Sequence, residues 1–237
     1  MQQEVFFEDL GNRKYKEVWA YHESLLSENS AIKASYRNQN EIPVQDWPTK
    51  NHLLFVEHPP VYTLGKNGNA ANVLMTTAFM EANGIDYFHI NRGGDITFHG
   101  PEQLVGYPIL DLEKFKTDLG WYLRSLEEVI ILTLAHYGIV AGRSAGETGV
   151  WLDAETPFAR KICALGVRAS RWVTMHGFAL NISNDLSYFN HIVPCGIPDK
   201  SVTSLQNELG TALTVNEVKE KVLQKFKQVF GVEISPS

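Results

Sequence analysis

Cysteine is scarce in this sequence of 237 residues, which contains only Cys163 and Cys195. So few cysteines in a chain of this size exclude a disulfide-built scaffold and favour a reducing compartment. No apolar run approaches the roughly 18 residues needed to cross a bilayer. Residues 1–9 lack the basic stretch and long apolar run of a secretory signal, so we expect a cytoplasmic protein without a membrane partner.

Positive charge is also in deficit, because 21 Lys and Arg residues stand against 27 Asp and Glu residues and give a net charge of −6. This balance argues against a uniformly basic nucleic-acid binder and leaves only a local basic patch open. Internal repeats and low-complexity blocks are absent as well. We therefore expect no nucleic-acid partner.

The remaining composition is that of a folded domain, with 44% apolar and 20% charged residues. A chain of this length can remove roughly 70–75% of its unfolded surface from water, which is enough for a proper core. We expect one catalytic domain over residues 1–237.

Strand-like apolar runs alternate irregularly with helical patterns. The expected strands are 5–7, 53–57, 61–64, 86–91, 104–112, 149–152, 161–168 and 173–182. The expected helices are 14–26, 74–82, 123–134 and a C-terminal helix over about 214–230, for which Thr214 and Glu217 form a capping box. The polar stretch 30–51, with Pro43 and Pro48, is expected to be a long loop. Adjacent strands in the second half favour an α+β fold with a mixed sheet over a doubly wound parallel sheet.

A glycine-rich segment at residues 92–101 is the first candidate for chemistry. Paired glycines let a backbone approach a ligand closely, and Arg92 and His99 can donate hydrogen bonds. The same residues could equally form a tight turn between strands. Their spacing fits neither a P-loop nor a dinucleotide-binding fingerprint.

The second candidate is a lysine within the apolar run 160–168. Strand alternation would place Lys161 on one face with Cys163 and Leu165. A buried lysine needs a partner or a depressed pKa, whereas a lysine on an edge strand simply points at water. Cys163 is interpreted as a small buried hydrophobe.

The third candidate is Cys195, which lies in a turn between Pro194 and Gly196. A free thiol has a pKa of about 8.5, so it is a poor nucleophile at neutral pH unless a nearby ammonium stabilises the thiolate. Lys161 is far upstream, so any such meeting must be tertiary. An inert loop thiol is the alternative interpretation. A metal site built from Cys163, Cys195, His176 and His191 is disfavoured, because closely spaced ligand pairs are missing.

Together these segments resemble the octanoyltransferase family of lipoate biosynthesis, the lipoyl(octanoyl)-protein transferases. The resemblance rests on residues 56–65, 92–99 with Gln103 following, 161–168, 176–181 and 194–196, which keep the family's order over roughly residues 5–205.

The resemblance implies a biotin/lipoate protein ligase-like fold, in which a mixed β-sheet flanked by helices holds an acyl-binding tunnel. It also implies transfer of an octanoyl group from octanoyl-acyl carrier protein to a lysine of a lipoyl domain, the first step of endogenous lipoate biosynthesis. The acceptors would be lipoyl domains of 2-oxoacid dehydrogenases and the glycine cleavage H protein. No cofactor and no metal are implied.

The resemblance further assigns site residues. The acyl group would be carried as a thioester on Cys195, which would pair with Lys161. The substrate-binding residues would be Arg92, Gly93, Gly94, Asp95, Ile96, Thr97, Phe98, His99, Ala164, Leu165, Gly166, Gly177, Phe178 and Ala179.

Two features depart from the family pattern. Glu102 stands where members usually carry glycine, and a positive φ there would cost about 1 kcal/mol. The segment 153–159 is longer than usual.

Two further expectations concern the substrates. Phe98, Tyr107, Leu165 and Phe178 are candidate walls for the octanoyl chain, although each could equally be ordinary core. Arg160, Lys161, Arg168 and Arg171 are the candidate basic patch for an acidic carrier.

Three rival functions stay open at this point. The first is an ATP-dependent lipoate or octanoate ligase of the same fold, which needs no cysteine nucleophile. The second is an enzyme that moves octanoyl between two lipoyl domains, and the third is a non-enzymatic module that binds lipoyl domains or the acyl carrier.

Overall fold

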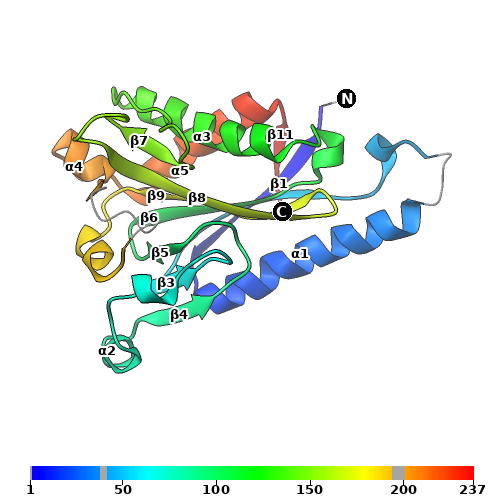
Figure 1. Ribbon diagram of the computed structural model, residues 1–237. Coiled ribbons are helices and arrows are strands. Elements are labelled where there is room, and N and C mark those ends of the chain that lie inside the picture. The colour runs from blue at the N-terminus through cyan, green and yellow to red at the C-terminus, as the bar shows by residue number, and fades with distance from the viewer. Residues whose placement is uncertain (1, 38–41, 194–200) are drawn as a thin grey trace.

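The structure, a computed structural model, describes residues 2–37, 42–193 and 201–237, and it contains two β-sheets with helices packed around them (Figure 1). The larger sheet has the strand order β10-β8-β9-β6-β2-β1-β11, and β7 pairs with β8. Its strands are β1 (Glu4–Asn12), β2 (Asn51–Glu57), β6 (Gln103–Ile109), β7 (Val150–Leu152), β8 (Arg160–Ser170), β9 (Val173–Asn181), β10 (Ser201–Val202) and β11 (Glu233–Pro236).

Strand directions in this sheet are mixed. β1 runs parallel to β2 and β11, and β8 runs parallel to β10. The pairs β2–β6, β6–β9 and β8–β9 are antiparallel. The expected α+β architecture with a mixed sheet is therefore confirmed.

A smaller sheet lies beside the larger one. In it β3 (Val61–Leu64) is flanked by β4 (Asp86–His89) and β5 (Ile96–His99), so the middle of the glycine-rich segment is a strand and both its ends lie outside the strand. The helix α2 (Thr77–Ala82) follows the sequence prediction but starts later, because the Thr76 side chain accepts a hydrogen bond from the Phe79 amide and caps it there.

Helices cover both faces of the larger sheet. Figure 1 shows α3 (Leu119–His136) and α5 (Val215–Phe230) on one face and α1 (Tyr15–Tyr36) on the other. The remaining short helices are α4 (Leu205–Leu209) and the 3₁₀ turns η1 (Val44–Asp46), η2 (Ala70–Asn72), η3 (Leu112–Lys114) and η4 (Leu186–His191).

Each face of the sheet has its own apolar core. On β6, Leu104 packs into the core under α3 and α5, whereas the next residue, Val105, packs into the core under α1. Successive side chains of a strand point to opposite faces, so a sheet covered on both sides needs continuous apolar runs. Each fully buried side chain of this size contributes about 1.5–3 kcal/mol.

The C-terminal helix α5 confirms the predicted cap. The Thr214 side chain accepts from the Glu217 amide, the Glu217 carboxylate accepts from the Thr214 amide, and the helix ends at Gly231. This helix packs along α3 and completes the first core.

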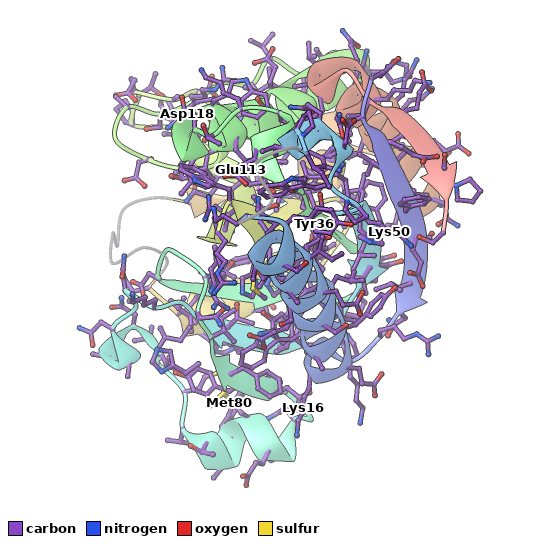
Figure 2. The ribbon with its side chains drawn as sticks, turned by 90° about the vertical axis from the view of Figure 1, so that its right-hand side faces the viewer. Lys16, Tyr36, Lys50, Met80, Glu113 and Asp118 are labelled. Atoms are coloured by element: carbon purple, nitrogen blue, oxygen red, sulfur yellow. The ribbon has the colours of Figure 1, made fainter. Side chains whose placement is uncertain are left out.

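The predicted loop over 30–51 is wrong at its start, because α1 continues to Tyr36. The buried face of its last turns carries Lys33, which forms ion pairs with Asp111 and with Glu113 at 2.7 Å. Figure 2 shows α1 between Lys16 and Tyr36, with Glu113 just beyond the Tyr36 end. A charged side chain on the buried face interrupts the apolar period, so the sequence pattern ended too early.

Candidate active site

A cavity of about 420 Å³ lies where β6, β8 and β9 of the larger sheet meet β5 of the smaller one. This volume is in the range of about 300–1,000 Å³ that small-molecule sites have. Most of the predicted substrate-binding residues line it: Arg92, Gly94, Asp95, Ile96, Thr97, His99, Ala164, Leu165, Gly166, Gly177, Phe178 and Ala179. Lys161 lines the same cavity.

The sheet register explains this convergence. In the β8–β9 ladder Ala164 pairs with Ala179 and Gly166 with Gly177, so two of the predicted segments are direct neighbours. The third segment is tied to β8 through the Gly93 amide, which donates to the Val167 carbonyl at 2.9 Å.

Two predicted residues do not line the cavity. Gly93 contributes its backbone bond to β8 instead. Phe98 lies in the core of the smaller sheet, where its ring stacks on Tyr188 with centroids 4.4 Å apart. Thr97 and His99 lie on the opposite face of β5 from Phe98, although Ile96, on the same face as Phe98, also lines the cavity. Of the four candidate walls for an acyl chain, Tyr107, Leu165 and Phe178 line the cavity.

Lys161 lies on β8, at the end nearest β7. Its Nζ is 4.5 Å from the centre of the Trp151 ring on β7, a cation–π geometry. Its neighbour in the parallel pairing is Val202 on β10, which also lines the cavity. The lysine that the sequence singled out is therefore part of the cavity wall.

The two cysteines differ. Cys163 is fully buried in the core under α3, and burial raises the pKa of its thiol far above the usual value. The interpretation of Cys163 as a small buried hydrophobe is confirmed. Cys195, with Pro194 and Gly196, lies outside the described residues. The described residues Phe189 and Val202, on either side of that stretch, both line the cavity.

A chain of buried amide and imidazole groups forms one wall. His99 Nδ1 bonds to Gln103 Oε1 at 2.9 Å, and Gln103 Nε2 donates to Asn181 Oδ1 at 2.9 Å. The Asn181 amide in turn donates to the Thr203 carbonyl at 3.0 Å. Since the Gln103 oxygen is the acceptor, Nδ1 of His99 carries the proton. Burial lowers the pKa of His99 to about 3, so the imidazole is neutral near pH 7.

Arg92 is held by the backbone around it. Its Nη2 donates to the Thr63 carbonyl at 2.5 Å and to the Thr63 hydroxyl at 3.0 Å, and its Nη1 donates to the Gly93 carbonyl at 3.0 Å. The guanidinium thus fixes the glycine turn against β3 while it lines the cavity.

Ion pairs partly neutralise the expected basic patch of Arg160, Lys161, Arg168 and Arg171. Arg160 forms ion pairs with Glu208 and Asp153, and Arg168 pairs with Glu23 at 3.4 Å. Glu208 and Glu23, which supply part of the compensating charge, are distant in sequence, so a local count of lysines and arginines cannot show it.

Glu102, which stands where family members usually carry glycine, has the positive φ that the sequence analysis considered. This residue has φ 62°, in the left-handed region that favours glycine, and its amide donates to the Glu57 carboxylate at 3.0 Å. His176 on β9 has φ 60°, although it lies within a strand, and its Nε2 bonds to Asn91 Oδ1 at 2.9 Å.

Sequence reasoning did not assign several lining residues to the site: Tyr15, Asn67, Gly146, Glu147, Thr148, Phe189 and Val202. The Gly146–Thr148 part had a usable signal, because residues 142–149 contain three glycines and a serine, the composition of a loop. Tyr15 carried no such signal, because in the sequence it is one more apolar position of the helix α1.

Within the described part of the chain, His, Cys, Asp and Glu side chains are nowhere gathered in threes as metal ligands. Across those same ranges no helix combines the length and apolarity needed to cross a membrane.

Comparison with known proteins identifies relatives along nearly the whole chain. The family model for the lipoyl protein ligase A/B catalytic domain matches residues 14–227. An octanoyltransferase of Flavobacterium johnsoniae is 57% identical over 235 residues, which cover 99% of this chain and 100% of the relative. An octanoyltransferase of Flavobacterium psychrophilum is 58% identical with the same coverage.

Solved structures resemble the fold. A lipoate-protein ligase A bound with ATP has a TM-score of 0.70 at 15% identity and covers 100% of this chain and 89% of its own. A bi-partite lipoate protein ligase from Thermoplasma acidophilum has a TM-score of 0.68 at 17% identity, with 100% and 87% covered. At such identities the likeness concerns architecture alone, and it confirms the expected lipoate protein ligase-like fold.

Proposed function

This chain belongs to the family of the lipoyl protein ligase A/B catalytic domain, and we propose that it is an octanoyltransferase that moves an octanoyl group onto a lysine of a lipoyl domain. The donor in this proposal is octanoyl-acyl carrier protein. The acceptors are lipoyl domains of 2-oxoacid dehydrogenases and the glycine cleavage H protein. The reaction takes place in the cytoplasm, where a free thiolate persists.

The observation that carries the proposal is the convergence on one cavity. Residues from three distant segments, together with Lys161, line a single space of about 420 Å³. Ala164 and Ala179 pair across β8 and β9, and their small side chains let a ligand approach this wall, which Gly166 and Gly177 also line. Tyr107, Leu165 and Phe178 offer apolar surface for an eight-carbon chain.

The first half-reaction loads the enzyme. The Cys195 thiolate attacks the carbonyl carbon of the octanoyl thioester, and a new C–S bond forms on Cys195. The bond between the acyl group and the carrier sulfur breaks, and the carrier leaves as a thiol after accepting a proton. One thioester replaces another, so this step is nearly balanced in free energy and needs no ATP.

The second half-reaction unloads it. The amine of the acceptor lysine attacks the acyl-Cys195 carbonyl, a C–N bond forms and the C–S bond to Cys195 breaks. The amine gives up a proton, and the cysteine is regenerated. An amide is more stable than a thioester, so this half drives the whole reaction.

Lys161 has two roles in this scheme. As an ammonium it stabilises the Cys195 thiolate, where one pKa unit corresponds to about 1.4 kcal/mol. It also donates a proton to the departing carrier thiol and accepts one from the attacking amine, a contribution of typically 10²–10⁴-fold for general acid–base catalysis. Backbone amides near Gly94, Gly166 and Gly177 are the candidates that hold the developing oxyanion.

The decisive experiment is mass spectrometry of the enzyme mixed with octanoyl-acyl carrier protein. We expect an octanoyl adduct on a peptide containing Cys195. Cys163→Ala is the matched control and should still be acylated, because the Cys163 thiol is buried in the core. An adduct that survives Cys195→Ala would refute the nucleophile.

A second arm separates the rival functions. Octanoyl transfer from the carrier to a lipoyl domain without ATP supports the proposal. Incorporation of free octanoate only with ATP would identify a ligase, transfer only from an octanoylated lipoyl domain would identify the exchange enzyme, and binding without transfer would identify a non-enzymatic module.

A further inference from the structure

The loop between α3 and β7 contributes residues to the cavity wall, and carboxylates outside the cavity hold the residues on either side of them. Gly146, Glu147 and Thr148 line the cavity. The residues at the two ends of this stretch do not line the cavity. The Ala145 amide donates to the Glu155 carboxylate, and the Gly149 amide donates to the Glu127 carboxylate.

Glu127 lies on α3 and is completely buried. Its Oε1 accepts from the Gly149 amide at 3.0 Å, while its Oε2 accepts from Arg124 Nη1 at 2.6 Å and Arg143 Nε at 2.9 Å. Burying a carboxylate costs several kcal/mol before its partners compensate it. An apolar residue would suit this position on α3 better for packing alone, since Leu126 and Ile130 beside it are core residues.

Gly149 connects this carboxylate to Lys161. It has φ 130°, and a β-carbon there would lie 3.3 Å from Lys161 Cε and 3.4 Å from Lys161 Cδ. The backbone of Gly149 therefore packs directly against the aliphatic part of the lysine. Trp151, two residues further on, places its ring 4.5 Å from Lys161 Nζ. The segment that Glu127 holds thus contacts Lys161 at both its stem and its head.

Glu155 holds the near end of the loop. Its Oε1 accepts from the Ser144 hydroxyl at 3.0 Å and from the Ala145 amide at 2.7 Å. Glu155 belongs to the segment 153–159 that the sequence marked as unusually long. This gives the longer segment a structural purpose, because its Glu155 holds the end of the loop around Ser144 and Ala145.

We propose that Glu127 is a positioning residue for octanoyl transfer, which acts by fixing Gly149 and thereby the side chain of Lys161 at the cavity wall. This inference rests on the proposed function. Displacements of about 1 Å in a catalytic group can cost about 10²-fold in rate, so a rigid support beneath Lys161 matters for turnover. Glu127 itself does not line the cavity, so the substrate does not contact it.

The test compares Glu127→Gln with the matched control Glu128→Gln. Glu128 is the next residue of α3 and also pairs with Arg143, at 2.6 Å, whereas the Gly149 amide donates to Glu127. We expect Glu127→Gln to lower kcat at least tenfold and to change KM for the carrier and for the lipoyl domain by less than twofold. Glu128→Gln should keep kcat within twofold of the unmodified enzyme.

The outcomes distinguish this inference from the proposed function. If the unmodified enzyme transfers no octanoyl group, the proposed function fails. If it does, and Glu127→Gln only loses thermal stability with a normal kcat, Glu127 is merely structural and the inference is wrong.

Glu127→Asp is the second variant, in case Glu127→Gln does not fold. Aspartate keeps the charge for both arginines but is one methylene too short for the Gly149 amide. We expect it to fold and to lose kcat in the same way, and a normal kcat in this variant would equally overturn the inference.

Discussion

Gly177 on β9 approaches Gly106 on β6 so closely that a β-carbon on Gly177 would lie 2.1 Å from the Gly106 carbonyl oxygen. No real β-carbon fits there, so the strands can keep this spacing only with glycine. We predict that Gly177→Ala destabilises the fold by about 1–3 kcal/mol, as overpacking of a core does. Chemical denaturation measures this loss.

The control for that prediction is Gly142→Ala. A β-carbon at Gly142 meets nothing within 4 Å, so this variant should stay within about 0.5 kcal/mol of the unmodified protein. If Gly177→Ala unfolds at the same denaturant concentration as Gly142→Ala, the two strands can separate at no cost and the argument from spacing is wrong.

Lys161 gives a prediction about turnover. In Lys161→Arg the arginine keeps the positive charge of the lysine but does not release a proton at neutral pH. Loss of general acid–base catalysis should therefore lower kcat by about 10²-fold or more. Steady-state octanoyl transfer measures the change.

Lys66→Arg is the matched exchange at an exposed position after β3, and it should leave kcat unchanged. Near-normal turnover in Lys161→Arg would instead show that Lys161 acts through its charge alone, so that proton transfer takes another route.

The sequence predicted much of the fold because most strands here are buried on both faces. The apolar run 53–56 and the largely apolar run 173–182 favour buried strands, and the cap at Thr214 is a strictly local signal. The prediction of where α1 ends was wrong for the opposite reason. Lys33 becomes a buried residue only through Asp111 and Glu113, which are nearly eighty positions away.

The same distinction between local signals and tertiary contacts explains which site residues the sequence could predict. Segments with an unusual local composition, such as the glycines at 93–94 and the lysine at 161, were recognised from the chain alone. Tyr15 and Val202 were not, because nothing in their surroundings differs from ordinary core. The neutralisation of Arg160 by Glu208 is likewise a tertiary fact.

Glu102 provides a prediction of increased stability. Its φ of 62° costs an L-residue about 1–2 kcal/mol, and glycine removes that cost while it adds freedom to the unfolded chain. We predict that Glu102→Gly raises the free energy of unfolding by about 0.5–1 kcal/mol. The hydrogen bond to the Glu57 carboxylate is kept, because residue 102 donates it through its backbone N–H.

The opposite sign is expected for Glu220→Gly, which replaces an exposed residue inside α5 and should cost about 1 kcal/mol of helix propensity. Denaturation of both variants under one condition compares the two effects. A loss of stability in both would mean that Glu102 makes contacts that outweigh its backbone strain.

The last prediction concerns acid. His22 is fully buried, its ring packs against Tyr107 and His176, and neither ring nitrogen has a hydrogen-bond partner among the described residues. Burial lowers its pKa to about 3, and burial likewise lowers the pKa of His58 to about 4. In the unfolded chain a histidine has a pKa of about 6.5. Below that pH the unfolded state binds protons that the folded state does not bind, so the free energy of unfolding falls as the pH falls.

Each such histidine should remove about 1.4 kcal/mol per pH unit between pH 6.5 and its folded pKa. We therefore predict that His22→Phe, which keeps a ring against Tyr107, reduces the slope of stability against pH between 6 and 4.5 by one proton. Leu119→Met, an exchange of an exposed residue of α3 that has no titratable group, should leave the slope unchanged. If His22→Phe also leaves it unchanged, the His22 imidazole must already accept a proton in the folded protein, which its apolar and aromatic surroundings do not support.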